Sequence, residues 1–218
     1  MSGIGLFVVC AAYAAIAAHV LRPAARERAA LFDADVTPHD RAVFERAVFL
    51  LLVPPGVLLH EAGHALATWQ VGGTVVGWGW YLFSGHVRYV GDLTALEDWW
   101  ISLAGNLVSV GIGVVAAALL ALPLRPALFY VVLAFARIQL VYALVGYPLL
   151  SLGTGWGDWT TIYSRAGGAW AVAMAVAHAA SLVAMWRIGR SERYAAWVAR
   201  RLGESGSRAA TAARLPLG

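Results

Sequence analysis

The chain has 218 residues, of which 61% are hydrophobic and only 13% are charged. A soluble domain of this length rarely carries so few charges, and several apolar runs reach the roughly 18 residues that cross a bilayer as a helix. These runs are continuous rather than alternating, which argues against a membrane β-barrel. The net charge of +4 comes from arginines placed around the apolar runs, a pattern of membrane orientation rather than of nucleic-acid binding.

The sequence therefore predicts an all-α polytopic membrane protein with about five transmembrane helices and a small membrane-associated β-hairpin. The five predicted spans are residues 4–21, 47–71, 99–122, 126–150 and 168–186. Grouped by role, they give a first transmembrane helix within 1–22, a core over 45–165, a last transmembrane helix within 166–188 and a basic tail over 189–218. No positive charge precedes the first apolar run, so we expect an uncleaved helix rather than a secretory signal peptide.

Arginines gather on one side of the predicted bundle. The loop 22–46 carries five arginines offset by five acids, the turn after the third span carries Arg125, and the segment after the fifth span carries seven arginines, from Arg187 to Arg214. The opposite side carries only Arg88 and Arg165. This asymmetry places the loop, the turn and the C-terminal tail in the cytoplasm and the N-terminus outside, and it favours a plasma membrane.

The second predicted span contains His60, Glu61 and His64. Two histidines four positions apart lie on one face of a helix, where both imidazoles can bind one metal ion. Glu61 is placed to act as general base on a metal-activated water. Imidazole ligands with an open coordination position favour Zn²⁺. The alternative is a pair of helix-packing histidines with a buried Glu61 hydrogen-bonded to one of them.

Pro54 and Pro55 precede this motif by about one turn. Prolines within a helix leave carbonyl groups without their usual donors and bend the helix. The bend could open a path for water and substrate to the metal, or it could be a simple kink of the kind common in membranes. The sequence leaves both readings open.

Residues 72–91 interrupt the helical pattern with strand-like runs and several glycines. They predict a hairpin that lies at the outer face or dips into it. Strand edges cannot face lipid, so the hairpin must pack on protein or line a wet cavity. His86 in its second strand could contact substrate, act as a spare metal ligand or lie on the surface.

A catalytic zinc site needs a third protein ligand, and Asp158 is the predicted one. It lies in a glycine-rich segment after the fourth span, where glycines let the chain turn back into the bundle. His60 lies about 14 residues into the second span, or roughly 21 Å from the inner face, so both residues are expected in the outer half of the membrane. The alternative is a solvated loop acid. Other acids on this side are Asp92, Glu97 and Asp98.

The tail and two mid-span residues carry weaker signals. Apolar residues recur at helical spacing among arginines over 190–202, which predicts a helix on an anionic inner leaflet, or alternatively a solvated basic tail. Residues 203–218 are expected to lack structure. Arg137 and His178 lie within predicted spans, where polar side chains are usually paired in the bundle interior. We expect a structural role for both.

The motif in a span, the hairpin after it and the aspartate two helices later together make the chain resemble the site-2 protease family of intramembrane zinc metalloproteases. The resemblance covers about residues 45–165 and is closest to short bacterial members without a PDZ domain. It implies that His60 and His64 are ligands and that Glu61 is the general base. Residues 85–88 resemble the hairpin thought to bind extended substrate, and Leu103–Ser109 resembles the family's Ala-Gly-Pro helix start.

The chain departs from the family pattern at three positions. Asn106 stands where proline is usual, Ser109 where asparagine is usual, and Trp159 where the glycine of an Asp-Gly pair is usual. His86 and Asn106 are the substrate contacts that the resemblance suggests.

These observations predict an intramembrane zinc metalloprotease that hydrolyses peptide bonds of membrane-embedded substrates. The partners expected are a membrane-protein substrate and the lipid bilayer, with no nucleic acid; the sequence does not predict an oligomeric state. One alternative is a proteolytically inactive relative that keeps the metal and binds or regulates another membrane protein. A less favoured alternative is a small transporter with the histidines as a transit site.

Overall fold

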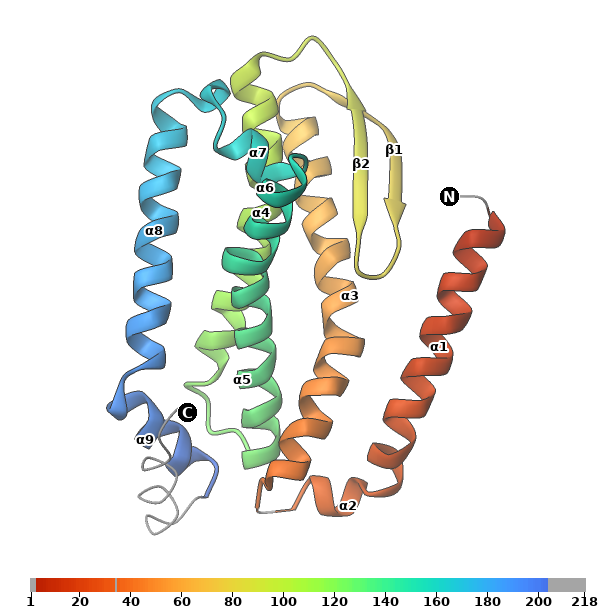
Figure 1. Cartoon of the computed structure of the whole chain (residues 1–218), viewed down its shortest axis with the longest axis vertical. Coiled ribbons are helices and arrows are strands. Elements are labelled where there is room, and N and C mark those ends of the chain that lie inside the picture. Colours follow the sequence, from red (N-terminus) through yellow and green to blue (C-terminus); the bar gives the residue numbers. More distant parts are fainter. Residues whose placement is uncertain (1–2, 34, 204–218) are drawn as a thin grey trace.

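The computed structural model describes residues 3–33 and 35–203 and is mainly helical (Figure 1). Its three central helices are α3 (Pro38–Gln70), α4 (Ala95–Leu119) and α5 (Pro126–Val141). On the two flanks of this centre lie α1 (Gly3–Arg26) and α8 (Ala169–Gly189). The shorter elements are α2 (Arg28–Leu31), β1 (Thr74–Trp80), β2 (Gly85–Val90), the π-turn η1 (Tyr142–Gly146), α6 (Tyr147–Thr154), α7 (Asp158–Ile162), the 3₁₀ turn η2 (Arg165–Gly167) and α9 (Glu192–Arg201).

Four helical segments of the described chain are long and apolar enough to cross a bilayer. They are Pro38–Gln70, Ala95–Leu119, Pro126–Thr154 and Ala169–Gly189. They coincide with the second to fifth predicted spans and indicate insertion into a membrane. The first predicted span forms the 24-residue helix α1, which is not among these four, so a membrane crossing by α1 stays a prediction.

Helix ends differ from the predicted boundaries because of capping. The predicted second span began at residue 47, whereas α3 begins at Pro38, where the side chains of Thr37 and Asp40 form a capping box. Thr94 and Glu97 form the same reciprocal pair at the start of α4. Each box satisfies backbone N–H groups that the first helical turn leaves without partners. The helices therefore extend beyond their apolar runs into polar sequence.

The α3 and α4 backbones approach closely because small residues lie between them. A Cβ atom on Gly63 would lie 2.9 Å from the carbonyl oxygen of Ala104 and 3.0 Å from Cα of Gly105. On α4 the small residues repeat every three or four positions, which allows close helix packing in membranes. They are Ser102, Gly105, Ser109 and Gly113, and all four lie in the buried part of α4.

Helix α3 runs without a break through Pro54 and Pro55. Pro54 has no N–H to donate to the carbonyl of Leu50 four residues earlier. The hydroxyl of Tyr13 in α1 donates to that carbonyl instead. The two prolines thus create an attachment point for α1, and α3 continues as one helix to the histidine motif.

The predicted hairpin is present as an antiparallel pair, with Thr74 opposite Val90 and Trp80 opposite Gly85. It runs down beside α3 toward α1 (Figure 1). Its tip is held by Phe83, whose ring stacks on Phe49 of α3 at 5.0 Å between centroids and meets the ring of Tyr13 at 6.0 Å. The hairpin therefore packs on protein, as strand edges at this depth require.

The fourth span contains a π-turn that the sequence did not predict. Helix α5 passes through η1 into α6, and the wider turn interrupts the regular backbone pattern. His178 of α8 reaches this turn, and its Nε2 donates to the carbonyl of Leu144 at 2.7 Å. Its Nδ1 then accepts from the hydroxyl of Tyr163. The structural role expected of His178 is confirmed.

The predicted helix over 190–202 forms α9, but its apolar residues pack on protein. The ring of Trp197 meets the ring of Phe129 in α5 at 5.3 Å between centroids, and Leu202 is only 2% exposed. The guanidinium of Arg201 lies 4.9 Å from the same Phe129 ring. The apolar side of α9 thus covers the end of the bundle; contact of this helix with the inner leaflet stays a prediction. Residues 204–218, the rest of the predicted basic tail, lie outside the described residues.

Candidate metal centre

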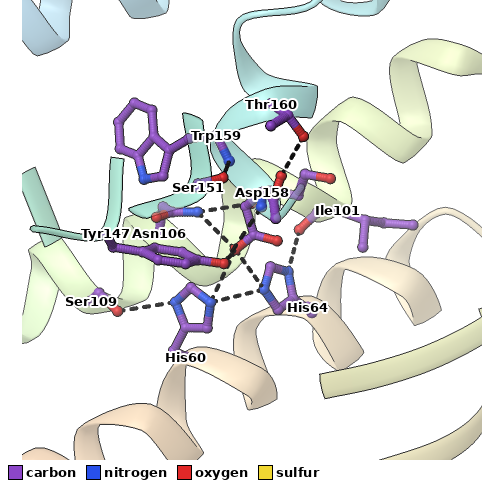
Figure 2. A network of polar contacts seen from close by, with 12 residues as sticks. His60, His64, Ile101, Asn106, Ser109, Tyr147, Ser151, Asp158, Trp159 and Thr160 are labelled. Carbon is purple, nitrogen blue, oxygen red and sulfur yellow. Dashed lines mark hydrogen bonds and ion pairs between the residues drawn. The ribbon is translucent and has the colours of Figure 1, made fainter. Parts of the chain in front are cut away.

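His60 and His64 lie on one face of α3, one turn apart and pointing toward each other (Figure 2). Their Nε2 atoms are 3.0 Å apart. The rings meet edge to face, with centroids 4.6 Å apart. Both residues are buried, with exposed fractions of 9% and 7%. The helical spacing thus places two imidazole nitrogens in one buried location, as the motif predicted.

Asp158 joins the two histidines from a segment 98 residues after His60 in the sequence. Helix α6 ends at Thr154, and Gly155 and Gly157 have φ angles of +76° and +109°, a region that side chains with a Cβ rarely adopt. The chain reverses there, and α7 begins at Asp158. Its Oδ2 lies 3.1 Å from Nε2 of His60 and 3.2 Å from Nε2 of His64. The predicted three-residue group is therefore brought together.

The outer nitrogen of each imidazole is bonded to the protein. Nδ1 of His64 donates to the backbone carbonyl of Ile101 at 2.7 Å, because a carbonyl can only accept. In a neutral imidazole the other nitrogen then carries a lone pair, so Nε2 of His64 is an electron-pair donor. Nδ1 of His60 lies 3.1 Å from Oγ of Ser109, which can fix the same tautomer. Such bonds to the outer nitrogen are typical of metal-ligating histidines.

The ligand atom of Asp158 is also oriented by neighbours. Nδ2 of Asn106 donates to Oδ2 at 3.1 Å and the hydroxyl of Tyr147 donates to it at 3.0 Å. Burial alone would raise the pKa of Asp158, but His60 and His64 outweigh burial when their imidazoles are protonated and then hold the pKa of this carboxyl well below its usual value. The hydrogen bonds from Asn106 and Tyr147 favour the anion as well. Asp158 is therefore an anion at neutral pH.

The three inner atoms fit one divalent cation. Two nitrogen atoms and a carboxylate oxygen, 3.0 to 3.2 Å apart, would repel one another unless a positive charge lies between them. Ligand atoms bound at about 2.0–2.2 Å to one tetrahedral zinc ion lie about 3.3–3.5 Å apart. A shift of a few tenths of an ångström therefore fits the donor set to zinc. Two imidazoles and one carboxylate leave one of four positions open, as in catalytic zinc sites.

Glu61 lies beside this group in the wall of a cavity of about 310 Å³. The cavity is lined by α3, α4, the start of β2 and the region from α5 to α7. Its lining includes His60, Ser109 and Tyr147. Glu61 is 5% exposed, and no described side chain forms a hydrogen bond or ion pair with its carboxylate. A Cβ atom on Gly85 would lie only 2.5–2.7 Å from the Glu61 side chain. The hairpin therefore touches the predicted general base.

The other residues singled out in the sequence are not placed as metal ligands. His86 is exposed on the hairpin and stacks on Tyr81 at 5.9 Å between ring centroids; it does not line the cavity, and its contact with substrate stays a prediction. Asn106 lies at the centre, but bonded to Asp158. Asp98 accepts from the hydroxyl of Tyr89. Arg137, expected to be paired in the bundle interior, is instead exposed on α5.

Sequence reasoning missed two side chains that complete the centre. Tyr147 contacts Asp158 because the π-turn rotates α6 relative to α5, and no pattern of apolar residues reveals such a turn. Ser109 was noted in the sequence as a departure from the family pattern and was given no contact with a ligand, although its spacing of seven from Ser102 already placed it on the buried face. Its hydroxyl supports His60.

Comparisons with protein-family models, curated proteins and solved structures found no match to this chain. The functional conclusion therefore rests on the geometry of the centre and on the membrane-spanning character of the helices that hold it.

Proposed function

We propose that this protein is an intramembrane zinc metalloprotease, similar in mechanism to the site-2 protease family. The observation that carries the proposal is the convergence of His60, His64 and Asp158 beside Glu61, in a cavity between helices long and apolar enough to span a membrane. A zinc ion held by these three ligands would lower the pKa of a water molecule and polarise a substrate carbonyl.

The residues of the chain have separate roles in this proposal. The carboxylate of Glu61 takes the proton from the attacking water and delivers it to the leaving amide nitrogen. Ser109 and the carbonyl of Ile101 keep the imidazoles oriented, while Asn106 and Tyr147 keep the Asp158 carboxylate oriented. Burial of Glu61 strengthens its electrostatic interactions and keeps other water away.

The substrate class follows from where the cavity lies. A peptide bond within a helix is shielded by its own hydrogen bonds, so a transmembrane substrate must unwind locally before hydrolysis. A two-stranded sheet leaves one edge of each strand without a strand partner, and an extended peptide can add to such an edge. The close contact between Gly85 and Glu61 would bring a peptide bound along β2 near the general base.

We also propose in which membrane the protein lies and which end of the bundle faces the cytoplasm, following the placement of the arginines. The α2 and α9 end of the bundle would face the cytoplasm of a bacterial cell, and the metal centre would lie in the outer half of the plasma membrane. The arginine-rich segment after α8 supports this orientation, because six of the sixteen arginines lie there and Arg187 lies in the last turn of α8.

The decisive experiment compares the parent with Glu61→Gln, which keeps the shape of the side chain but removes the base. Both proteins are produced at equal levels in the same cells, and new peptide termini in the membrane fraction are identified by mass spectrometry. We expect cleavages within predicted transmembrane segments in the parent and none above background in Glu61→Gln. Asp92→Asn, an exposed acid at the same end of the bundle, is the matched control and should retain the cleavages.

Zinc content is measured in the same preparations. Parent and Glu61→Gln should bind zinc equally, because Glu61 is not a ligand. Equal sets of termini in the two proteins, with zinc retained in both, would contradict proteolysis and favour an inactive metal-binding relative. Zinc that accumulates inside sealed vesicles would favour the transporter instead.

A further inference from the structure

A second cavity, of about 280 Å³, lies at the other end of the bundle and shares no lining residue with the metal centre. Glu45 of α3 forms one side of it. The other side is a single stripe of α5, in which residues recur at three- and four-residue spacing; among them are Tyr130, Leu133, Arg137, Ile138 and Val141. The cavity is thus an apolar groove that contains one acid and one base.

Both charges are exposed although they belong to membrane-spanning helices. Glu45 and Arg137 are exposed in the described structure, within the candidate spans Pro38–Gln70 and Pro126–Thr154. One oxygen of Glu45 accepts from the hydroxyl of Tyr130 at 2.6 Å. No described residue forms an ion pair with Arg137. Charges that face lipid without a partner of opposite charge are costly, so an occupant of complementary charge would stabilise the groove.

The two charges lie at different depths. Helices α3 and α5 start at the same end of the bundle (Figure 1). Glu45 is seven residues from Pro38, or about 10 Å, and Arg137 is eleven residues from Pro126, or about 16 Å, at 1.5 Å per residue. The acid therefore lies near the membrane surface and the base lies deeper. The long side chain of Arg137 can extend from there toward the surface.

We propose that this groove binds a glycerophospholipid whose headgroup carries both a phosphate and a primary ammonium. In such a lipid the ammonium lies on the water side of the phosphate. The ammonium would donate hydrogen bonds to Glu45, and the phosphate would bind the guanidinium of Arg137. One acyl chain would then lie along Ile138 and Val141, which line the deeper part of the groove.

The alternatives fit the groove less well. A quaternary ammonium has no N–H to donate to Glu45. A headgroup with a phosphate but no cation would leave Glu45 beside a second negative charge; the guanidinium of Arg41, which lies 5.5 Å from the Tyr130 ring, is the nearby positive charge that could offset this. A helix of another protein needs a longer surface than a groove of about 280 Å³ provides.

The test measures lipid retained by the purified full-length chain, using native mass spectrometry. The probes are phosphatidylethanolamine, phosphatidylcholine and phosphatidylglycerol with identical acyl chains. We expect about tenfold tighter binding of phosphatidylethanolamine than of the other two, or about 1.4 kcal/mol, because only its ammonium donates hydrogen bonds to Glu45. Glu45→Gln should remove this preference, whereas Arg137→Gln should weaken the binding of all three lipids, because all three carry the phosphate. Arg125→Gln, an exposed arginine at the start of the same helix, should keep the preference.

A second readout needs no variant of the protein. The parent protein is tested with lipids whose headgroup ammonium carries one, two or three methyl groups. Retention should fall with the loss of N–H donors and be lowest for the choline lipid. Equal retention of the three lipids, a preference that survives Glu45→Gln, unchanged lipid binding in Arg137→Gln, or a dimer of the chain that Arg137→Gln dissociates, would each overturn the proposal.

Discussion

At the scale of single residues, the centre is organised by the hydrogen bonds behind its ligands. His64 is held by a backbone carbonyl, His60 by the Ser109 hydroxyl, and Asp158 by the Asn106 amide and the Tyr147 hydroxyl. Each bond fixes which atom faces inward. Outer contacts of this kind tune metal affinity without touching the metal.

Ser109→Ala should therefore weaken zinc binding about tenfold or more, within the 10–100-fold range typical of outer contacts. The cause is loss of the hydroxyl that orients His60. Ser102→Ala is the control, because Ser102 is buried on the same face of α4 and its hydroxyl has no described contact with the ligands. Competition with a zinc-chelating dye measures both affinities. Equal affinities in the two variants would show that Ser109 does not orient the ligand.

Gly105 affects the centre through its lack of a side chain. A Cβ atom there would lie 2.4 Å from Nε2 of His64. Gly105→Ala should therefore displace the imidazole and abolish stoichiometric zinc binding. Gly111→Ala on the same helix meets no atom within 4 Å, so it should keep zinc. Because alanine favours a helix over glycine by about 1 kcal/mol, Gly111→Ala should also be at least as stable as the parent. Zinc retained in Gly105→Ala would contradict the close approach.

At the scale of elements, the centre depends on irregular segments more than on regular ones. The histidines need only a helix, whereas Asp158 needs the π-turn, the end of α6 and two glycines with positive φ. His178 connects α8 to this region, since it bonds to Leu144 of the π-turn and its ring lies 4.5 Å from that of Trp159, the residue after Asp158.

His178→Phe should keep the ring but leave the Leu144 carbonyl and the Tyr163 hydroxyl without their partner. We expect a loss of about 1–3 kcal/mol in the free energy of unfolding, the cost of leaving one buried polar group unsatisfied. Only the Leu144 carbonyl counts here, because Tyr163 is exposed. Zinc affinity should fall as well, because Trp159 and Asp158 shift together. Ser181→Ala on the same helix is the control, since its hydroxyl bonds only within α8. Thermal unfolding in detergent measures the effect, and identical melting of both variants would contradict it.

The sequence predicted the regular elements and missed the irregular ones for physical reasons. Apolar runs located four spans, and glycines between strand-like runs located the hairpin, because these features are local. Asp158 was found because a zinc site needs a third ligand and glycines mark a chain reversal. Tyr147, the π-turn and the packing of Trp197 on Phe129 depend on contacts between distant segments, which leave no periodic pattern.

At the scale of the whole molecule, two ends of the bundle carry different chemistry. The metal centre and hairpin lie at one end, and the groove with Glu45 and Arg137 lies toward the other.

Metal binding should couple to stability, because the ligands come from α3 and α7 and must converge to bind. Any ligand that binds only the folded state stabilises it, by about 2.7 kcal/mol at a hundredfold excess over Kd. Chelation should therefore lower the melting temperature of the parent.

The central claim is that one divalent cation is bound by His60, His64 and Asp158. The most direct test is the metal content of the full-length protein purified after growth with zinc, compared with Asp158→Ala and with His86→Ala as the control. The account predicts about one zinc ion per chain in the parent and in His86→Ala, and a loss of stoichiometric zinc in Asp158→Ala. A parent protein without zinc, or an Asp158→Ala variant that keeps it, would contradict the account.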